Sequence, residues 1–241
     1  MHKRFFVDFP IGEEKRISLE DEGILHQLLS VFRVKLGEDV ILLDDSGFEY
    51  EAMVKGVGKK EIIVQINGKK EGKKQDVVIN LFQSVLKKDN VELVLGKCTE
   101  IGISKFVPVL VERSIKLNLN DERLHKIAKE ASEQCGRSKM PQLEETISFY
   151  DAIAMAISDK DAVNFIFHEE SGQCCDKLSC EFLSHFKEAK KFNIFIGPEG
   201  GFADGEIELA KNNNFYVLSL GGLVLRAETA AIVASALIIN K

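Results

Sequence analysis

Two glycine-containing loops near the carboxyl end of the chain contain the candidate binding and catalytic residues. The first loop, residues 197–204, reads Gly-Pro-Glu-Gly-Gly-Phe-Ala-Asp and follows the apolar run 192–196. Glycines after a buried parallel strand let the backbone approach a ligand closely, and ligands bind at this edge of open α/β sheets. The spacing matches neither the dinucleotide nor the P-loop fingerprint, and no lysine is present to hold a phosphate. A turn that only reverses the chain would explain this loop alone equally well.

The second loop strengthens the case for a binding site. It runs from Leu220 to Arg226 and again lies between a strand-like run and a helical pattern, so both loops would line the same edge of a sheet. Its leucines could sandwich a flat heterocycle while backbone groups read the edge of that heterocycle, as in a cofactor pocket. Arg226 is unusual because a cation gains nothing from the positive amino end of a helix. A salt bridge to Glu228 or Glu199 would also account for it.

These loops require a sheet behind them. From residue 77 onward, apolar strand-like runs alternate with helical patterns, which indicates a mostly parallel sheet covered by helices. We expect strands at 77–85, 106–111, 163–167, 192–196 and 215–220, and helices at 91–102, 122–137, 150–157, 178–189, 206–211 and 228–239. Asp204 is expected to be the N-cap of the helix that follows the first loop.

The amino-terminal part of the chain has a different pattern. Residues 4–66 contain short apolar runs separated by turn residues, which indicates a small antiparallel β domain, and residues 22–34 interrupt it with helical spacing. The stretch 67–75 contains two glycines and four lysines but no apolar residue, as is typical of an exposed connection. We therefore divide the chain into domains of residues 1–72 and 73–241.

Composition excludes several classes of protein. The 241 residues are 45% hydrophobic and 29% charged, which is typical of a globular protein rather than a disordered chain or a coiled coil. The net charge of −6 means that an RNA partner would have to meet a local basic patch. Five cysteines without a CxxC pair, and histidines without paired spacing, favour reduced thiols and no metal. The charged amino terminus and short apolar runs argue against secretion or a membrane span, so we expect a cytoplasmic protein.

The segments 196–202 and 220–230 resemble the paired signature of the ribosomal RNA small subunit methyltransferase E family, within the SPOUT class of knotted methyltransferases. Further matching motifs occur in the same order at 4–6, 26–33, 97–102, 112–114 and 130–137. The resemblance implies a small PUA-like β-barrel domain at the amino end, which binds RNA. It also implies an α/β domain with a mostly parallel sheet and a trefoil knot that forms the donor pocket, and a homodimer through that domain.

The same resemblance implies S-adenosyl-methionine as methyl donor and N3 of a uridine in 16S ribosomal RNA as acceptor. The donor is then expected to bind Ile196, Gly197, Pro198, Gly200, Gly201, Leu218, Ser219, Leu220, Gly221, Leu225, Arg226 and Thr229. Loss of the N3 proton leaves negative charge on the uracil, which a fixed cation would stabilise, and we expect Arg226 to supply it. Either Glu199 or Glu228 could accept the proton or orient Arg226, and Glu199 could equally cap backbone N–H groups of its loop.

A target base inside a duplex must be splayed out before such a pocket can reach it, which requires a second contact with the RNA. The motif matches favour Arg4, Arg33, Lys97, Arg113 and Arg137 as the residues that bind RNA. Salt bridges on a solvated surface would also explain basic residues of this kind. The leading hypothesis is a methyltransferase acting on 16S ribosomal RNA, with an assembled small ribosomal subunit favoured as partner. The alternatives are a non-catalytic RNA-binding protein, a SPOUT enzyme acting on another RNA, and an α/β transferase that uses another nucleotide.

Overall fold

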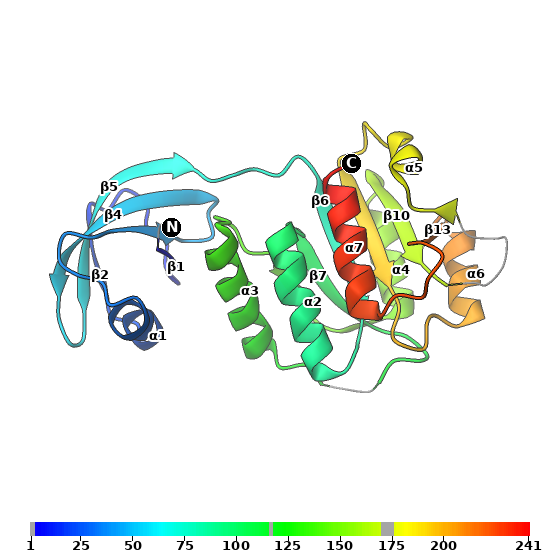
Figure 1. Ribbon diagram of the computed structural model, residues 1–241, viewed down its shortest axis with the longest axis horizontal. Coiled ribbons are helices and arrows are strands. Elements are labelled where there is room, and N and C mark those ends of the chain that lie inside the picture. Colours follow the sequence, from blue (N-terminus) through cyan, green and yellow to red (C-terminus); the bar gives the residue numbers. More distant parts are fainter. Residues whose placement is uncertain (1–2, 116–117, 170–175) are drawn as a thin grey trace. The chain divides into compact units, whose positions relative to one another are not determined.

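A computed structural model describes residues 3–115, 118–169 and 176–241. The chain divides into two compact units (Figure 1). The first comprises Met1–Lys74 and Ser132–Met140, and the second comprises Gln75–Ala131 and Pro141–Lys241. Of the five cysteines, Cys174 and Cys175 lie outside the described residues, whereas Cys98 is buried and Cys135 is partly buried. No described helix is long and apolar enough to cross a lipid bilayer.

The first unit is built on a five-stranded sheet with the order β1-β3-β4-β5-β2. Its strands are β1 (Arg4–Phe6), β2 (Arg16–Leu19), β3 (Asp39–Leu43), β4 (Phe48–Val57) and β5 (Ile62–Glu71). The β3–β4, β4–β5 and β2–β5 pairs are antiparallel, as expected, but β1 pairs with β3 in parallel. The expected barrel is therefore a mixed sheet with β1 and β2 at its edges among the described residues.

The helical pattern at 22–34 forms a shorter and less regular element than expected. α1 (Glu22–His26) begins at the N-cap Asp21, whose carboxylate accepts a hydrogen bond from the Ile24 N–H, and continues into the π-helical turn η1 (Gln27–Val31). Arg33 then takes a left-handed backbone conformation with φ of 49°, which ends the helix. The buried stripe of this segment, centred on Leu28, packs on the sheet and accounts for the helical periodicity.

The second unit contains an eight-stranded sheet in which every pair of strands is parallel, which confirms the expected α/β arrangement. The strand order is β11-β13-β10-β12-β6-β7-β8, with β9 paired to β7. The strands are β6 (Val78–Ser84), β7 (Lys105–Leu110), β8 (Gln142–Leu143), β9 (Ile147–Ser148), β10 (Ala162–Phe167), β11 (Asp176–Lys177), β12 (Lys191–Ile196) and β13 (Tyr216–Ser219).

Helices cover both faces of this sheet. They are α2 (Lys88–Ile101), α3 (Asp121–Cys135), α4 (Phe149–Ser158), α5 (Cys180–Ser184), α6 (Asp204–Asn212) and α7 (Ala227–Ile239). One apolar core lies between the sheet and α2 and α7, which run side by side in Figure 1, and a second lies against α4 and α6. Alternate residues of the central strands supply the two cores: Leu81 and Ile194 face the first, whereas Phe82 and Phe195 face the second.

Two local predictions in this unit are wrong. The helix expected at 178–189 is only the five residues of α5, because its end tightens into i→i+3 hydrogen bonds at His185 and Phe186. The N-cap of α6 is Ala203 and not Asp204. The Glu206 carboxylate accepts a hydrogen bond from the Ala203 N–H at 2.8 Å, so this side chain, one turn further on, supplies the cap.

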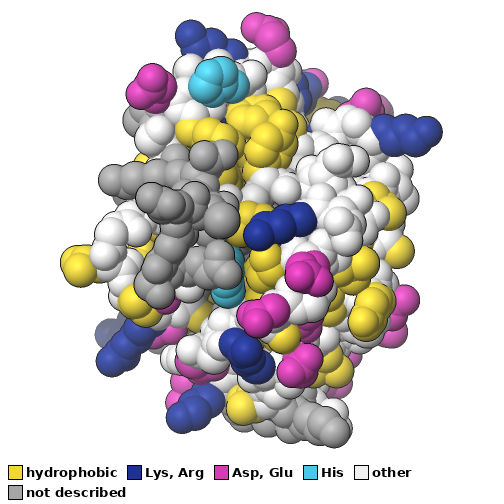
Figure 2. Space-filling view, turned by 90° about the vertical axis from the view of Figure 1, so that its right-hand side faces the viewer, with side chains coloured by type: hydrophobic (Ala, Val, Ile, Leu, Met, Phe, Trp, Pro, Cys, Tyr) yellow, Lys and Arg dark blue, Asp and Glu magenta, His cyan; other side chains and the backbone are white. Residues whose placement is uncertain are grey.

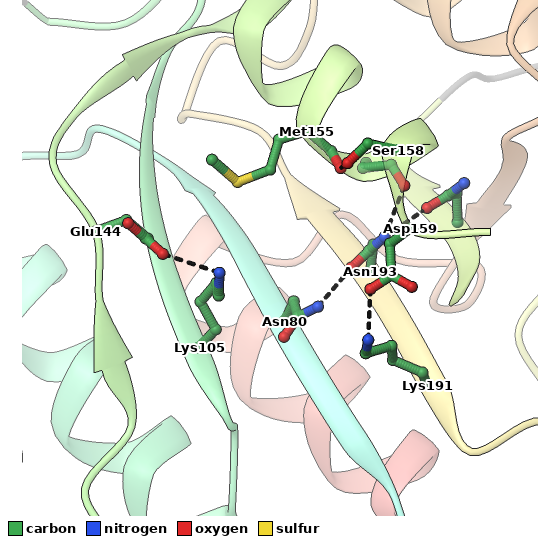
Figure 3. Close-up of polar contacts among 10 residues, drawn as sticks. Asn80, Lys105, Glu144, Met155, Ser158, Asp159, Lys191 and Asn193 are labelled. Carbon is green, nitrogen blue, oxygen red and sulfur yellow. Dashed lines mark hydrogen bonds and ion pairs between the residues drawn. The ribbon is translucent and has the colours of Figure 1, made fainter. Parts of the chain in front are cut away.

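A ladder of three asparagines fixes the register of the central strands, and Figure 3 shows the hydrogen bond between two of them, Asn80 and Asn193. Asn80 on β6, Asn193 on β12 and Asn164 on β10 are direct neighbours across the sheet. The Asn80 amide donates to the Asn193 side-chain oxygen at 2.8 Å, and the Asn193 amide donates to Asn164 at 2.8 Å and to the Ala156 carbonyl at 3.3 Å. Because a one-residue slip would turn a strand's asparagine to the opposite, apolar face, this ladder specifies the pairing of all three strands.

Candidate functional site

A cavity of about 700 Å³ lies at the carboxyl ends of β10, β12 and β13, within the size range of small-molecule sites. The two glycine-containing loops expected from the sequence form most of its wall. Figure 2 shows one face of the molecule. Among the described residues on this face, apolar side chains lie beside basic and acidic ones, and the two signs of charge are mixed.

The first loop connects β12 to α6 and follows the expectation that its glycines serve backbone geometry. Gly201 has φ of +67°, which disfavours any residue with a Cβ, and its amide N–H donates to the Pro198 carbonyl at 2.9 Å. A Cβ added at Gly201 would meet no atom within 4 Å, because this position faces open space. At Gly197, an added Cβ would come within 3.2 Å of the buried Phe202 ring. The loop therefore combines one glycine that packs tightly with one that leaves room for a ligand.

The second loop connects β13 to α7 and has the same character. Gly221 has φ of +152°, and a Cβ added there would also meet no atom within 4 Å. The carboxylate of Glu169, just after β10, accepts a hydrogen bond from the Leu225 N–H at 2.8 Å and so holds the carboxyl end of the loop. Leu223 and Val224, at the middle of the loop, are 84% and 81% exposed.

The expected catalytic residues occupy different positions around the cavity. Arg226 lines it and is the N-cap residue of α7, with a side chain that is 86% exposed. Glu199 is an exposed residue of the first loop and also lines the cavity. Glu228 does not line it; its side chain is 13% exposed and one carboxylate oxygen lies 4.0 Å from an Arg226 nitrogen. The structure therefore brings Glu199 and Arg226 to one cavity. Glu228 lies outside the cavity wall, next to Arg226.

The residues expected to bind the donor converge in the same way. Those that line the cavity are Ile196, Gly197, Pro198, Gly200, Gly201, Leu218, Ser219, Leu220, Gly221, Leu225 and Arg226, whereas Thr229 is not part of the wall. The leucines supply apolar surface and the glycine loops supply backbone N–H and C=O groups, which together suit a flat heterocycle with a polar edge. Among residues 3–115, 118–169 and 176–241, no cluster of three or more His, Cys, Asp or Glu side chains could hold a metal ion.

The basic residues expected to contact RNA are dispersed. Arg113 lies at the cavity, and Lys97 on α2 forms a 2.8 Å ion pair with Glu100. In the first unit, Arg4 lies 3.8 Å from the Glu49 carboxylate, and Arg33 is exposed. Arg137 is held by a 3.0 Å hydrogen bond from its Nε to the Lys139 carbonyl, and burial lowers the pKa of its guanidinium below the usual value. Arg4, Arg33 and Arg137 thus belong to the first unit, and Lys97 and Arg113 belong to the second.

The part of the cavity wall at the carboxyl end of β10 was not predicted from the sequence. Phe167, His168 and Glu169 line it because β10 lies between β12 and β13 in the sheet. The strand at 163–167 was expected, so the rule that ligands bind at the carboxyl ends of parallel strands could have identified the two residues that follow it. Leu223, one of the leucines expected to sandwich a heterocycle, also lines the cavity. Gly222, Val224, Ala227 and Ala230 complete the wall without having been expected as binding residues.

Comparisons with known proteins agree with one another. A family model described as an RNA methyltransferase domain matches residues 73–239, and one described as an RNA methyltransferase PUA domain matches residues 21–67. Ribosomal RNA small subunit methyltransferase E of Rickettsia conorii is 28% identical over 98% of this chain and 94% of its own length. The protein of the same name from Mesomycoplasma hyopneumoniae is 30% identical over 95% of each chain. The crystal structure of ribosomal RNA small subunit methyltransferase E from Neisseria gonorrhoeae bound to S-adenosyl methionine is similar with a TM-score of 0.85, at 25% identity over 98% of this chain and 96% of that one.

Proposed function

Because the chain belongs to the RNA methyltransferase family, we propose that it transfers a methyl group from S-adenosyl-methionine to N3 of a uridine in small-subunit ribosomal RNA. The observation that carries this proposal is the cavity between the two glycine loops, whose wall contains nearly all of the residues expected to bind the donor. The protein is a methyltransferase, and its relatives of the same length are named for action on ribosomal RNA.

The cavity fits the donor in size and in the chemistry of its wall. Gly201 and Gly221 each leave open space where a side chain would stand, and Leu218, Leu220 and Leu225 supply apolar surface for an adenine ring. When bound, S-adenosyl-methionine supplies an electrophilic methyl group on its sulfonium. The loop backbones then serve to bind and orient the donor, and water is displaced from the cavity.

The proposed chemistry uses Arg226 and Glu199. The N3 proton of the uracil would pass to a carboxylate, and the N3 lone pair so released would form the new bond to the methyl group while the methyl–sulfur bond breaks and S-adenosyl-homocysteine leaves as a neutral thioether. Glu199 is better placed to accept that proton than Glu228, because Glu199 lines the cavity and Glu228 does not. The exposed guanidinium of Arg226 stabilises the negative charge that develops on the uracil oxygens. Glu228, 4.0 Å behind it, orients Arg226.

We assign RNA binding mainly to the amino-terminal domain, residues 1–72, and donor binding to residues 73–241. The PUA match at residues 21–67 supports the first assignment. Arg4 and Arg33 in this domain, together with Arg137, Lys97 and Arg113, are the proposed contacts to the phosphates of 16S ribosomal RNA, which would make affinity fall with salt. The substrate implies action in the cytoplasm.

We also propose a trefoil knot and a homodimer for the carboxyl-terminal domain. β13 lies beyond β10, away from the centre of the sheet, yet α7 packs on β6, β12 and α2, so the loop 220–226 carries the chain back across the sheet (Figure 1). This return supports the proposed knot, which requires in addition that the returning chain passes through a loop of the preceding chain. On α7, Val233 and Leu237 are only half-buried and offer an apolar surface to a second copy. Sedimentation measurements on the pure protein test the dimer.

The test of the function is methyl transfer from labelled S-adenosyl-methionine to small ribosomal subunits that lack the modification. Digestion and mass spectrometry should locate the label in 3-methyluridine. Label in another nucleoside would refute the acceptor assignment, and donor binding without transfer to subunits would favour another RNA. Absence of donor binding would support a non-catalytic RNA-binding protein.

A further inference from the structure

The side chain of Arg113 reaches the first glycine loop from a different part of the sheet. Arg113 lies in a tight turn after β7, which is closed by a 3.0 Å hydrogen bond from the Ser114 N–H to the Val111 carbonyl. The Ser114 hydroxyl also accepts a hydrogen bond from the Val111 N–H at 3.2 Å. These two bonds fix the direction in which the Arg113 side chain leaves the backbone.

From this turn, Arg113 holds the loop on both sides of Gly201. Its Nη1 donates hydrogen bonds to the Gly200 carbonyl at 3.0 Å and to the Phe202 carbonyl at 3.3 Å. Between these carbonyls lies Gly201, with its left-handed φ of +67° and the open space of the cavity beside it. Without a constraint, two consecutive glycines would sample many backbone conformations.

A second contact joins the same turn to the end of the loop. The Glu112 N–H donates to one oxygen of Glu206 at 2.9 Å, and the other oxygen of Glu206 accepts from the Ala203 N–H at 2.8 Å. The residue pair 112–113 therefore holds the loop at Gly200, at Phe202 and, through Glu206, at Ala203. The contacts span 87 to 94 residues of sequence.

We infer that Arg113 is a positioning residue for the donor cavity, because it holds the Gly200–Phe202 backbone in the conformation that leaves room for the ligand beside Gly201. This inference rests on the proposed function and assigns Arg113 a role other than, or besides, phosphate contact with RNA. This role of Arg113 predicts the size of the effect. If the loop adopts the ligand-binding conformation for only a fraction of the time, the apparent affinity for the donor falls to that fraction of its full value.

The test is isothermal titration of S-adenosyl-methionine and of 5′-methylthioadenosine, which lacks the amino-acid part of the donor, into four proteins. These are the wild type, Arg113→Ala, Arg113→Lys and the matched control Arg123→Ala, whose arginine is exposed on α3 and paired with Glu92 at 2.9 Å. Arg113→Ala should weaken both ligands about tenfold, as expected when the competent loop is populated one tenth of the time. Arg113→Lys should recover only part of this loss, because lysine lacks the planar fork of arginine. The control should bind both ligands like the wild type.

A second variant reaches the loop without removing a positive charge. Glu206→Gln keeps one oxygen as an acceptor but replaces the other with an amide nitrogen, so one of the two backbone hydrogen bonds is lost. It should weaken donor binding in the same direction as Arg113→Ala, while affinity for a ribosomal RNA fragment stays the same or rises. Arg113→Ala is expected to bind that RNA within about twofold of the wild type when the donor is absent, because the guanidinium donates to the Gly200 and Phe202 carbonyls instead of contacting RNA.

The possible outcomes separate the hypotheses. Unchanged donor affinity with weakened RNA binding would overturn the inference and make Arg113 a phosphate contact. Weakened binding of S-adenosyl-methionine alone, with methylthioadenosine unaffected, would also overturn it, because Arg113 would then contact the amino-acid part of the donor directly. Failure of the wild-type protein to bind either ligand would instead contradict the proposed function.

Discussion

Replacing Asn193 by leucine tests whether the asparagine ladder stabilises the second unit. Asn193 is 1% exposed, and its side chain takes part in three hydrogen bonds, with Asn80, Asn164 and the Ala156 carbonyl. Leucine has a similar volume, so the substitution removes these hydrogen bonds without leaving a large cavity. The substitution therefore affects stability mainly by leaving the Asn80 and Asn164 side chains and the Ala156 carbonyl without these hydrogen bonds.

The expected cost follows from those groups. A buried polar group without a partner costs about 1–3 kcal/mol. Asn80 is 9% exposed and Asn164 is half-buried, so water can partly hydrate both, and the added apolar surface of leucine offsets part of the remainder. We therefore expect the free energy of unfolding to fall by about 2–4 kcal/mol.

Urea unfolding followed by far-UV circular dichroism measures this change, since the chain contains no tryptophan for fluorescence. Asn212→Leu, the same substitution at an exposed position of α6, is the control and should change stability by less than about 0.5 kcal/mol. The double variant with Asn80→Leu should cost less than the sum of the two single changes, because both partners of one hydrogen bond are then removed. A loss of stability below about 0.5 kcal/mol for Asn193→Leu would mean that the ladder contributes no more than a surface residue, which contradicts a stabilising role.

Three further predictions concern the site and the core. Arg226→Ala should lower kcat for methyl transfer at least about a hundredfold, while the donor affinity measured by titration stays within about twofold of the wild type. The reason is that the proposed role of the guanidinium is to stabilise charge that develops only during the reaction. An unchanged kcat would exclude Arg226 from catalysis. Gly201→Val should abolish donor binding, since valine both fills the open space and disfavours φ of +67°, and an unchanged titration curve would show that the donor lies elsewhere. Burial raises the pKa of the Cys98 thiol to about 12. The unfolded chain loses that proton from about pH 8.5 whereas the folded chain keeps it, so the contribution of Cys98 to stability falls between these pH values. Alkylation at pH 9 should accordingly spare Cys98 until denaturant is added, and rapid labelling of the native protein would contradict its burial.

Local periodicity was sufficient to predict most of the second unit. Apolar runs such as 192–196 are buried strands because both of their faces are covered, and their alternation with helices predicted the parallel order of the sheet. Predictions that depended on one local residue were less secure. Asp204 has a side chain suited to capping a helix. The Glu206 side chain instead accepts a hydrogen bond from the Ala203 N–H, and the N-cap is Ala203, one residue before Asp204.

The site was predictable where it follows strand ends and unpredictable where it depends on distant contacts. Both glycine loops could be placed at one sheet edge, because parallel strands end together. By contrast, the hydrogen bond between Glu169 and Leu225 joins residues 56 apart, and the one between Arg113 and Gly200 joins residues 87 apart. No periodicity within the chain encodes such pairs. They depend on the strand order, which places β10 between β12 and β13 and sets β7 beside β6.

Because α7 is the last helix of the sequence and packs on central strands, the sheet remains partly uncovered until the end of synthesis. A nascent chain that ends at Ile196 already contains the strands β6, β7, β10 and β12, yet it lacks both glycine loops and the helix that covers Ile79 and Leu81. α2 is already present and covers part of this face, but until α7 emerges the part that α7 covers is exposed to chaperones and proteases. Because Ala227 and Ala230 of α7 are part of the cavity wall, donor binding at the proposed site would require that synthesis has passed through this helix. A chain truncated before α7 should therefore be degraded rather than accumulate as a competitor for the substrate.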